Sequence, residues 1–361
     1  MPRFTKVVGF PLLIVLITFG LGWSAQDAWA NGNDPYGEGL KMGKGSRLQG
    51  EPLDTSERRS YREIPKDEAA NYVDIKKFPP KDYLYVANYW HLDRFYVAAI
   101  PVDLDVKQAI LQVVYFVPQD VMHHMQGRFD HPKTPILLFQ QTTDKDPHFK
   151  PISIDSSTIS LEAVGTVRFP ADFGVKNGLD GSLAASHRLM SSETKTRMLV
   201  YDLHQETRQY PLVFTGDRLN NFWKFALGAF YDPEMTKVYH FLKYNCTNSW
   251  FSVIDRFMAK NSDSFLNRSL RSIPFELRGS FLYASNISLA VPTWIKMHLN
   301  RRGVISYANP YPNLDVEVGG PTPEAWNTCP TLLLNGAKDF VKNTVSRIKK
   351  VTGFPGMPYE G

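Results

Sequence analysis

Residues 244–258 read YNCTNSWFSVIDRFM, and they mark the point where predicted strands give way to predicted helices. From Trp250 onward the apolar side chains recur at helical spacing, which predicts an amphipathic helix. Asn245 is a good capping residue, so we expect this helix to begin at Cys246. A thiol at that place lies near unpaired backbone N–H groups and the positive end of the helix dipole, which favour a thiolate and suit an oxyanion hole.

Upstream of this helix the chain reads mainly as strands. Thr215 is expected to cap a first helix, and residues 142–195 have Gly, Ser and Asp breaks that predict loops with short strands. Strands followed by helices predict an α+β domain, with an antiparallel sheet and helices packed on it. The apolar runs read as strands are 83–89, 97–100, 110–117, 136–139, 198–203 and 210–214.

Composition excludes several classes of protein. The chain has 361 residues, 13% of them aromatic, and 25 prolines, which excludes a disordered protein and a coiled coil. The formal net charge of +5 is mild and no Lys/Arg run is interleaved with aromatic residues, so we expect no nucleic-acid partner. Two cysteines, Cys246 and Cys329, are too few for a disulfide scaffold.

The amino-terminal segment 1–30 predicts export from the cytoplasm. Arg3 and Lys6 precede an apolar stretch over residues 7–23, and Ala28–Ala30 supply a small-x-small end. This pattern is typical of a secretory signal peptide, and a single N-terminal membrane anchor is the alternative. Either one places the rest of the chain in a periplasmic or other extracytoplasmic compartment.

The rest of the chain divides into three parts. Residues 31–80 are rich in Gly, Pro and charge and predict an extended arm or linker, and residues 81–300 form the main domain. Residues 301–361 predict a loop over 303–323 and a C-terminal amphipathic helix packed on the same domain. The basic face of that helix leaves open a contact with an anionic membrane surface.

The chemistry of Cys246 needs a partner, and the residues alone leave several choices. A cysteine nucleophile usually takes a histidine base, and nine histidines are present. His123 and His124 are adjacent in a predicted strand, so only one of them can point at a given site. An inert buried thiol and a disulfide with Cys329 remain alternatives for Cys246.

A metal site is another alternative for the histidines. His123, His124 and His131, assisted by His148 or Asp130, are its candidate ligands. Their spacing is not the regular spacing of a zinc site, and neighbouring strand histidines diverge. We therefore expect no metal and no cofactor.

The stretch 198–255 contains Tyr210-Pro211-Leu212, the helix expected after Thr215, and Asn245-Cys246-Thr247 at the start of the next expected helix. With these motifs it resembles the Lnb N-terminal periplasmic domain family of bacterial envelope proteins. The segment HMQGRF at 124–129 is similar to a histidine-bearing strand upstream in that family.

This resemblance implies a papain-like cysteine site in permuted order, with histidine before cysteine, as in NlpC-type hydrolases and lecithin:retinol acyltransferase-like enzymes. It implies Cys246 as the nucleophile and His124 as the base, with His123 as the second choice. Gln141 or Gln140 stands where the family has a carboxylate, and would orient the histidine.

The expected function follows from these residues. We expect an extracytoplasmic cysteine hydrolase or acyltransferase, with a site built from Cys246, His124, Gln141 and Asn245. Its substrate would be an amide or ester of a cell-envelope component, whether a peptide, an acyl group or a lipid-linked group. The alternative is a non-catalytic envelope module that keeps the fold and acts in binding or as a chaperone.

Overall fold

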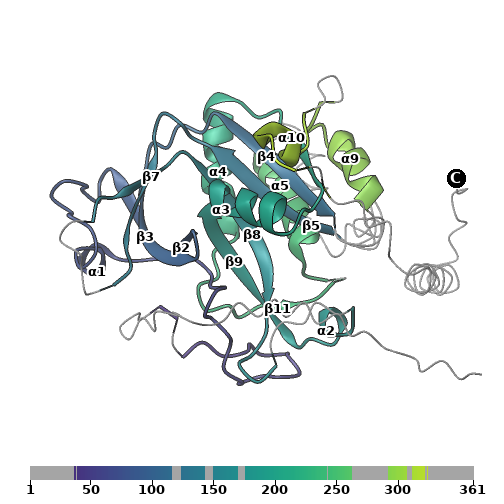
Figure 1. Cartoon of the computed structure of the whole chain (residues 1–361), viewed down its shortest axis with the longest axis horizontal. Coiled ribbons are helices and arrows are strands. Elements are labelled where there is room, and N and C mark those ends of the chain that lie inside the picture. The colour runs from purple at the N-terminus through teal and green to yellow at the C-terminus, as the bar shows by residue number, and fades with distance from the viewer. Residues whose placement is uncertain are drawn as a thin grey trace, which may run out of the picture.

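Eleven strands form one sheet in the computed structural model of this chain (Figure 1). The structure describes residues 36–37, 39–115, 123–142, 149–169, 175–241, 243–261, 292–306, 311–321 and 323. The strands are β1 (Arg62–Glu63), β2 (Tyr83–His91), β3 (Arg94–Pro101), β4 (Gln108–Tyr115), β5 (His123–Asp130), β6 (Ile136–Gln140), β7 (Ile152–Ile154), β8 (Ser156–Val164), β9 (Leu183–Ser191), β10 (Thr207–Pro211) and β11 (Val238–Tyr239).

The strand order is β10-β4-β5-β8-β9-β2-β3-β6-β7, with β1 paired to β2 and β11 paired to β9. Every pair is antiparallel except β2 with β9, where Tyr89 lies opposite Leu189 and Trp90 opposite Met190. The prediction of an α+β domain with a mostly antiparallel sheet and packed helices is therefore confirmed.

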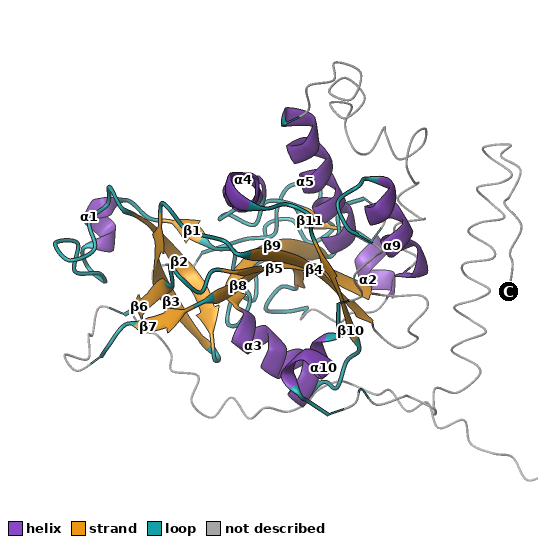
Figure 2. Ribbon diagram, turned by 90° about the horizontal axis from the view of Figure 1, so that it is seen from above, coloured by secondary structure: helices purple, strands orange, loops and turns teal. Residues whose placement is uncertain are grey.

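Helices cover both faces of the sheet. Figure 2 shows α4, α5 and α9 on one face, and α3 and α10 on the other. The helices are α1 (Lys66–Ala69), α2 (Val175–Leu179), α3 (Ser192–Thr196), a π-helix (Arg197–Asp202), α4 (Gly216–Ala229), α5 (Cys246–Lys260), α9 (Pro292–Arg301) and α10 (Leu314–Val318).

The face under α4 and α5 carries a large aromatic core. Phe129 of β5 lies with its ring centroid 4.9 Å from that of Trp223 in α4 and 6.2 Å from that of Trp250 in α5. Gly127, two residues earlier in β5, has no side chain, and the Trp250 ring occupies the space that a Cβ would need. This close approach fixes the first turns of α5 against β5.

Three segments differ from their predicted structure. Residues 142–195 contain two nine-residue strands, β8 and β9, that are buried at nearly every position. Both faces of the sheet are covered at β8 and β9, so the Ser and Ala residues there are buried. The alternation of apolar and polar residues that predicts a strand with one buried face is therefore absent. Residues 198–203 belong mainly to the π-helix, whose Leu199 and Val200 pack against Val114. The expected loop at 303–323 includes α10.

The segment that precedes the sheet packs on β2, β3 and β6. Ile64 and Tyr72 are buried against Tyr85 and Val97 at this end of the sheet. Met42 and Leu53 pack instead against Val164 of β8 and Ala184 of β9. Residues 1–30 and the C-terminal helix expected near 338–350 lie outside the described residues. Within the described ranges, every helix is too short or too polar to span a bilayer.

Candidate functional site

Cys246 is the first residue of α5, as predicted. Asn245 has an extended backbone, and its side chain accepts a hydrogen bond of 2.9 Å from the backbone N–H of Asn248. The amide of Asn245 also donates to the carbonyl oxygen of Phe241, which ties the cap to the preceding turn. The local signal of a capping residue followed by 3.6-residue periodicity was therefore sufficient to place the thiol at the amino end of a helix.

The sulfur of Cys246 is enclosed by its surroundings. The residue is 3% exposed and packs with Leu161 of β8 and Tyr239 of β11. Burial raises the pKa of the thiol, while hydrogen bonds from the backbone of Met125, the hydroxyl and backbone of Thr247, and the hydroxyl of Tyr239 act in the opposite direction. At neutral pH the thiol is protonated, with several donors already turned toward it.

The two histidines that open β5 point to opposite faces of the sheet. His123 lies on the α5 face, with its Nε2 2.8 Å from Oγ1 of Thr247. His124 lies on the α3 face, with its Nε2 2.8 Å from Oγ of Ser160. The structure therefore does not bring His124 to Cys246, because successive side chains of a strand alternate and α5 covers only one face.

His124 belongs to a buried charge cluster instead. Ser160 joins it to Glu162, whose carboxylate accepts hydrogen bonds from Arg188 at 2.6 Å and Lys195 at 2.8 Å. Burial, aided by the charge of Lys195, lowers the pKa of His124 to about 3. Burial alone favours the protonated carboxyl, but Arg188 and Lys195 hold the pKa of Glu162 well below its usual range. His124 is thus a neutral member of a charged core.

His123 is the histidine placed to act on the thiol. Burial lowers its pKa to about 4, so the ring is neutral at physiological pH. Thr247 lies between the two groups: its Oγ1 bonds Nε2 of His123 and is 3.9 Å from the sulfur of Cys246. Among the described residues Nδ1 of His123 has no hydrogen-bond partner, and no hydrogen bond joins the sulfur directly to an imidazole. The ring is a proton acceptor one side chain away from the thiol.

Gln141 lies elsewhere and has a different partner. Its Oε1 accepts from the backbone N–H of Asn88 at 2.7 Å, and its Nε2 donates to Oδ1 of Asn88 at 2.9 Å. Asn88 has φ of 62° in the irregular part of β2, and this pair of bonds holds it there. Strands β8, β9, β2 and β3 separate β6 from β5, so neither Gln141 nor Gln140 is brought to His123 or His124.

The alternatives for these residues have the following outcomes. Among the described residues Cys246 has no disulfide partner, and Cys329 lies outside them, so the predicted alternative of a Cys246–Cys329 bridge stays a prediction. Nε2 of His131 is 3.0 Å from Oγ of Ser157, and His148 also lies outside the described residues. In the part of the chain that the structure describes, no group of three or more His, Cys, Asp or Glu side chains could hold a metal ion.

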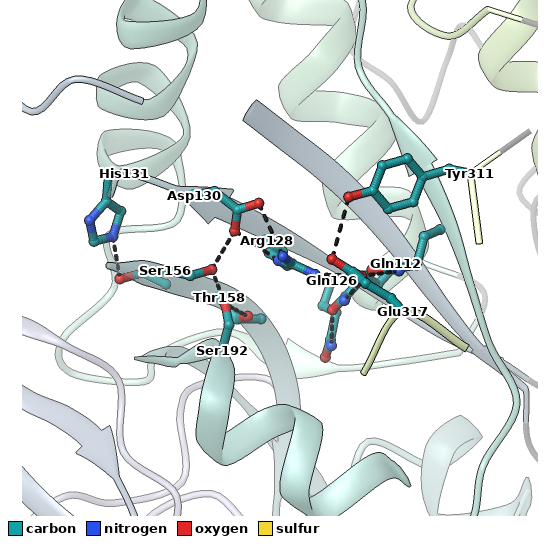
Figure 3. A network of polar contacts seen from close by, with 12 residues as sticks. Gln112, Gln126, Arg128, Asp130, His131, Ser156, Thr158, Ser192, Tyr311 and Glu317 are labelled. Atoms are coloured by element: carbon teal, nitrogen blue, oxygen red, sulfur yellow. Dashed lines mark hydrogen bonds and ion pairs between the residues drawn. The ribbon is translucent and has the colours of Figure 1, made fainter. Parts of the chain in front are cut away.

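A second polar region was not predicted from the sequence. Figure 3 shows it on the α3 and α10 face of the sheet. Gln126 donates to Gln112 at 2.7 Å, and Gln112 donates to Gln209 at 2.8 Å. Gln209 then donates to Glu317 of α10 at 2.6 Å. Arg128 of β5 bonds the same carboxylate oxygen at 2.8 Å. Polar residues occupy every second position of β5, so they all lie on one face of the sheet. This alternation was the sequence signal for the network, because helices on both sides of the sheet make that polar face a buried one.

The chain matches no family model, no curated protein and no solved structure. Function is therefore inferred from the residues and their geometry.

Proposed function

We propose that this protein is a cysteine-dependent hydrolase or acyltransferase, in which Cys246 is the nucleophile and His123 the base. One observation carries the proposal. The thiol at the amino end of α5 faces the side of β5 that presents His123, and Thr247 connects the two. His123 takes the role that the sequence assigned to its neighbour His124.

The proposed reaction runs through a thioester. The Cys246 proton passes to His123, and the sulfur bonds to the carbonyl carbon of an amide or ester. The backbone N–H groups of Met125 and Thr247, which face the sulfur, stabilise the negative charge on the carbonyl oxygen. The imidazolium returns the proton to the leaving amine or alcohol as its bond to carbon breaks.

A second acceptor completes the cycle. Water, or an alcohol or amine of a second substrate, gives a proton to His123 and attacks the thioester carbon. The carbon–sulfur bond breaks and the Cys246 sulfur recovers its proton. Water yields hydrolysis, whereas another nucleophile yields acyl transfer. Because Cys246 is 3% exposed and packs with Tyr239, a substrate reaches its sulfur only when neighbouring side chains move.

The leader-like segment 1–30 and the resemblance around Cys246 to the Lnb N-terminal periplasmic domain family favour an extracytoplasmic setting with a permuted papain-like core. Within that setting the candidate substrates are peptide cross-links, N-acyl groups and lipid-linked esters. The basic C-terminal helix and the N-terminal anchor that the sequence predicts are the candidate contacts with the membrane surface.

His123 and His124 lie on opposite faces of β5, so a substitution of His124 is the matched control for a substitution of His123. Alkylation of Cys246 by iodoacetamide is followed from pH 5 to 9 in the wild type, His123→Gln and His124→Gln. We expect His123→Gln to slow alkylation near pH 7 by about tenfold or more, the effect expected of a lost general base. We expect His124→Gln to react like the wild type. Equal rates in His123→Gln and the wild type would overturn the assignment.

A non-catalytic binding module is the second candidate function. The observation that favours it is the enclosure of the thiol, which has no direct bond to an imidazole within the described structure. A burst of p-nitrophenol from p-nitrophenyl acetate, absent in Cys246→Ala, separates the two functions because a burst reports an acyl-enzyme. A thiol that reacts only after unfolding, together with no burst, supports the binding module.

A further inference from the structure

A cavity of about 460 Å³ lies on the face of the sheet opposite Cys246. Its walls come from β5 and β8, from α3 and the π-helix that follows it, and from α10. The volume falls within the range of roughly 300–1,000 Å³ that small-molecule sites occupy. Because α5 covers the other face, this cavity is separate from the thiol and goes beyond the proposed reaction.

The charges that line the cavity cancel. Two guanidinium groups and two carboxylates face it, so its formal charge is zero. The guanidinium of Arg128 is 2.8 Å from Glu317, and that of Arg197 is 2.5 Å from Asp93. An anion placed here would compete with carboxylates that are already bound to both cations. The balance favours a ligand with no net charge.

The polar groups of the wall are held in fixed positions. Arg128 bonds both oxygens of Asp130, at 2.8 and 3.1 Å (Figure 3). Ser156 donates to Asp130 at 2.5 Å, and its Oγ lies 2.8 Å from Oγ of Ser192 in α3. The Arg128 side chain is only 15% exposed. Donors and acceptors that are already ordered lose little conformational entropy on binding, which makes them suitable for recognising hydroxyl groups.

One aromatic ring stands at the cavity. Tyr201 lines it and remains 48% exposed, so its ring is accessible to a ligand. It belongs to the π-helix Arg197–Asp202, a rare conformation that is frequently found at functional sites. A tyrosine ring offers a flat apolar surface with a polar tip, so it can cover one face of a ligand ring.

We propose that this cavity binds an uncharged sugar. A pyranose ring has an apolar C–H face and hydroxyl groups around its edge, which matches one aromatic ring surrounded by paired charges and hydroxyls. The C–H face packs on Tyr201. The sugar hydroxyls bond Ser192, Glu193 and Glu317, whose side chains line the same cavity.

Calorimetric titration of the full chain tests the proposal. The neutral probes are maltose, cellobiose and N,N′-diacetylchitobiose. The charged comparators are glucose 6-phosphate, glucuronic acid and glutamate. The variants are Tyr201→Ala, Tyr201→Phe and Tyr231→Ala, the last a tyrosine that is 41% exposed and lies outside the cavity lining. Cys246→Ala serves as the control for the thiol site.

We expect at least one neutral disaccharide to bind with millimolar or tighter affinity. Tyr201→Ala should weaken it about tenfold, whereas Tyr201→Phe, Tyr231→Ala and Cys246→Ala should bind like the wild type. The proposal is overturned if no neutral probe binds, if Tyr201→Ala leaves binding unchanged, or if a charged comparator binds more tightly through Tyr201. Loss of thiol reactivity in Cys246→Ala with sugar binding intact separates this site from the proposed enzyme.

Discussion

Replacing Gly127 with alanine tests how β5 holds α5 in place. A Cβ at this position would lie 2.3 Å from Cη2 and 2.5 Å from Cζ2 of Trp250. Ordinary contact begins at 3.4 Å, so the indole would have to move by 1.1 Å, which is 3.4 minus 2.3. Trp250 is fully buried, and its ring centroid is 4.8 Å from that of Phe230. The ring therefore moves only if the first turns of α5 move with it.

The cost can be estimated from two opposing effects. Overpacking a well-packed core destabilises a protein by about 1–3 kcal/mol, and an overlap with a rigid ring belongs at the upper end. Alanine regains about 0.5–1 kcal/mol over glycine inside a strand, because glycine loses more backbone freedom on folding. We expect Gly127→Ala to lower the free energy of unfolding by about 2 kcal/mol, a large part of a typical total of about 5–15 kcal/mol.

Urea unfolding followed by tryptophan fluorescence measures this change. Gly228→Ala is the matched control, because a Cβ added there near the end of α4 would meet no other part of the described chain within 4 Å. We expect that variant to gain about 0.5–1 kcal/mol. If Gly127→Ala unfolds at the same free energy as the wild type, the reasoning about this close approach is refuted.

Three further predictions concern charge, pH and the helix cap. Glu162→Gln leaves the buried Arg188 and Lys195 without their carboxylate, so thermal unfolding should show a loss of about 3–5 kcal/mol; a loss below 1 kcal/mol contradicts it. Burial lowers the pKa of His124 and His187 to about 3, below the unfolded value of 6.5, so their contribution to stability is present above pH 6.5 and is lost as pH falls from there toward 3. The melting temperature should be lower at pH 5 than at pH 7.5, and an equal or higher value at pH 5 refutes this. Asn245→Ala removes the α5 cap and should cost about 1 kcal/mol in urea unfolding; unchanged stability argues against the cap.

Local signals in the sequence were sufficient for α5 but not for every strand. The start of α5 at Cys246 follows from a capping residue and a single hydrophobic period, both confined to adjacent residues. β8 and β9 carry Ser, Thr and Ala at positions that are buried by distant parts of the chain. From the sequence alone, this polar character predicts a loop, because the helices that cover these strands are not apparent.

The choice between His123 and His124 also depends on more than local sequence signals. Strand alternation predicts that only one of them can face the thiol, and the structure agrees. Which one does so depends on the face that α5 covers, a long-range property that strand periodicity does not contain. Gln141 is a related case, because its partner Asn88 comes from a strand more than fifty residues earlier in the chain.

The parallel pairing of β2 with β9 has a consequence for synthesis of the chain. Tyr89 and its partner Leu189 are 100 residues apart (189 − 89), whereas β2 and β3 are joined by a tight hairpin. A chain that emerges from its amino end forms that hairpin early, and part of the β2 edge then stays open until β9 arrives. Open edges invite pairing with other chains, so the newly made polypeptide is most prone to aggregation during that interval. A chaperone that shields this edge would raise the yield of folded protein, and a chain ending before residue 183 would keep the edge permanently open.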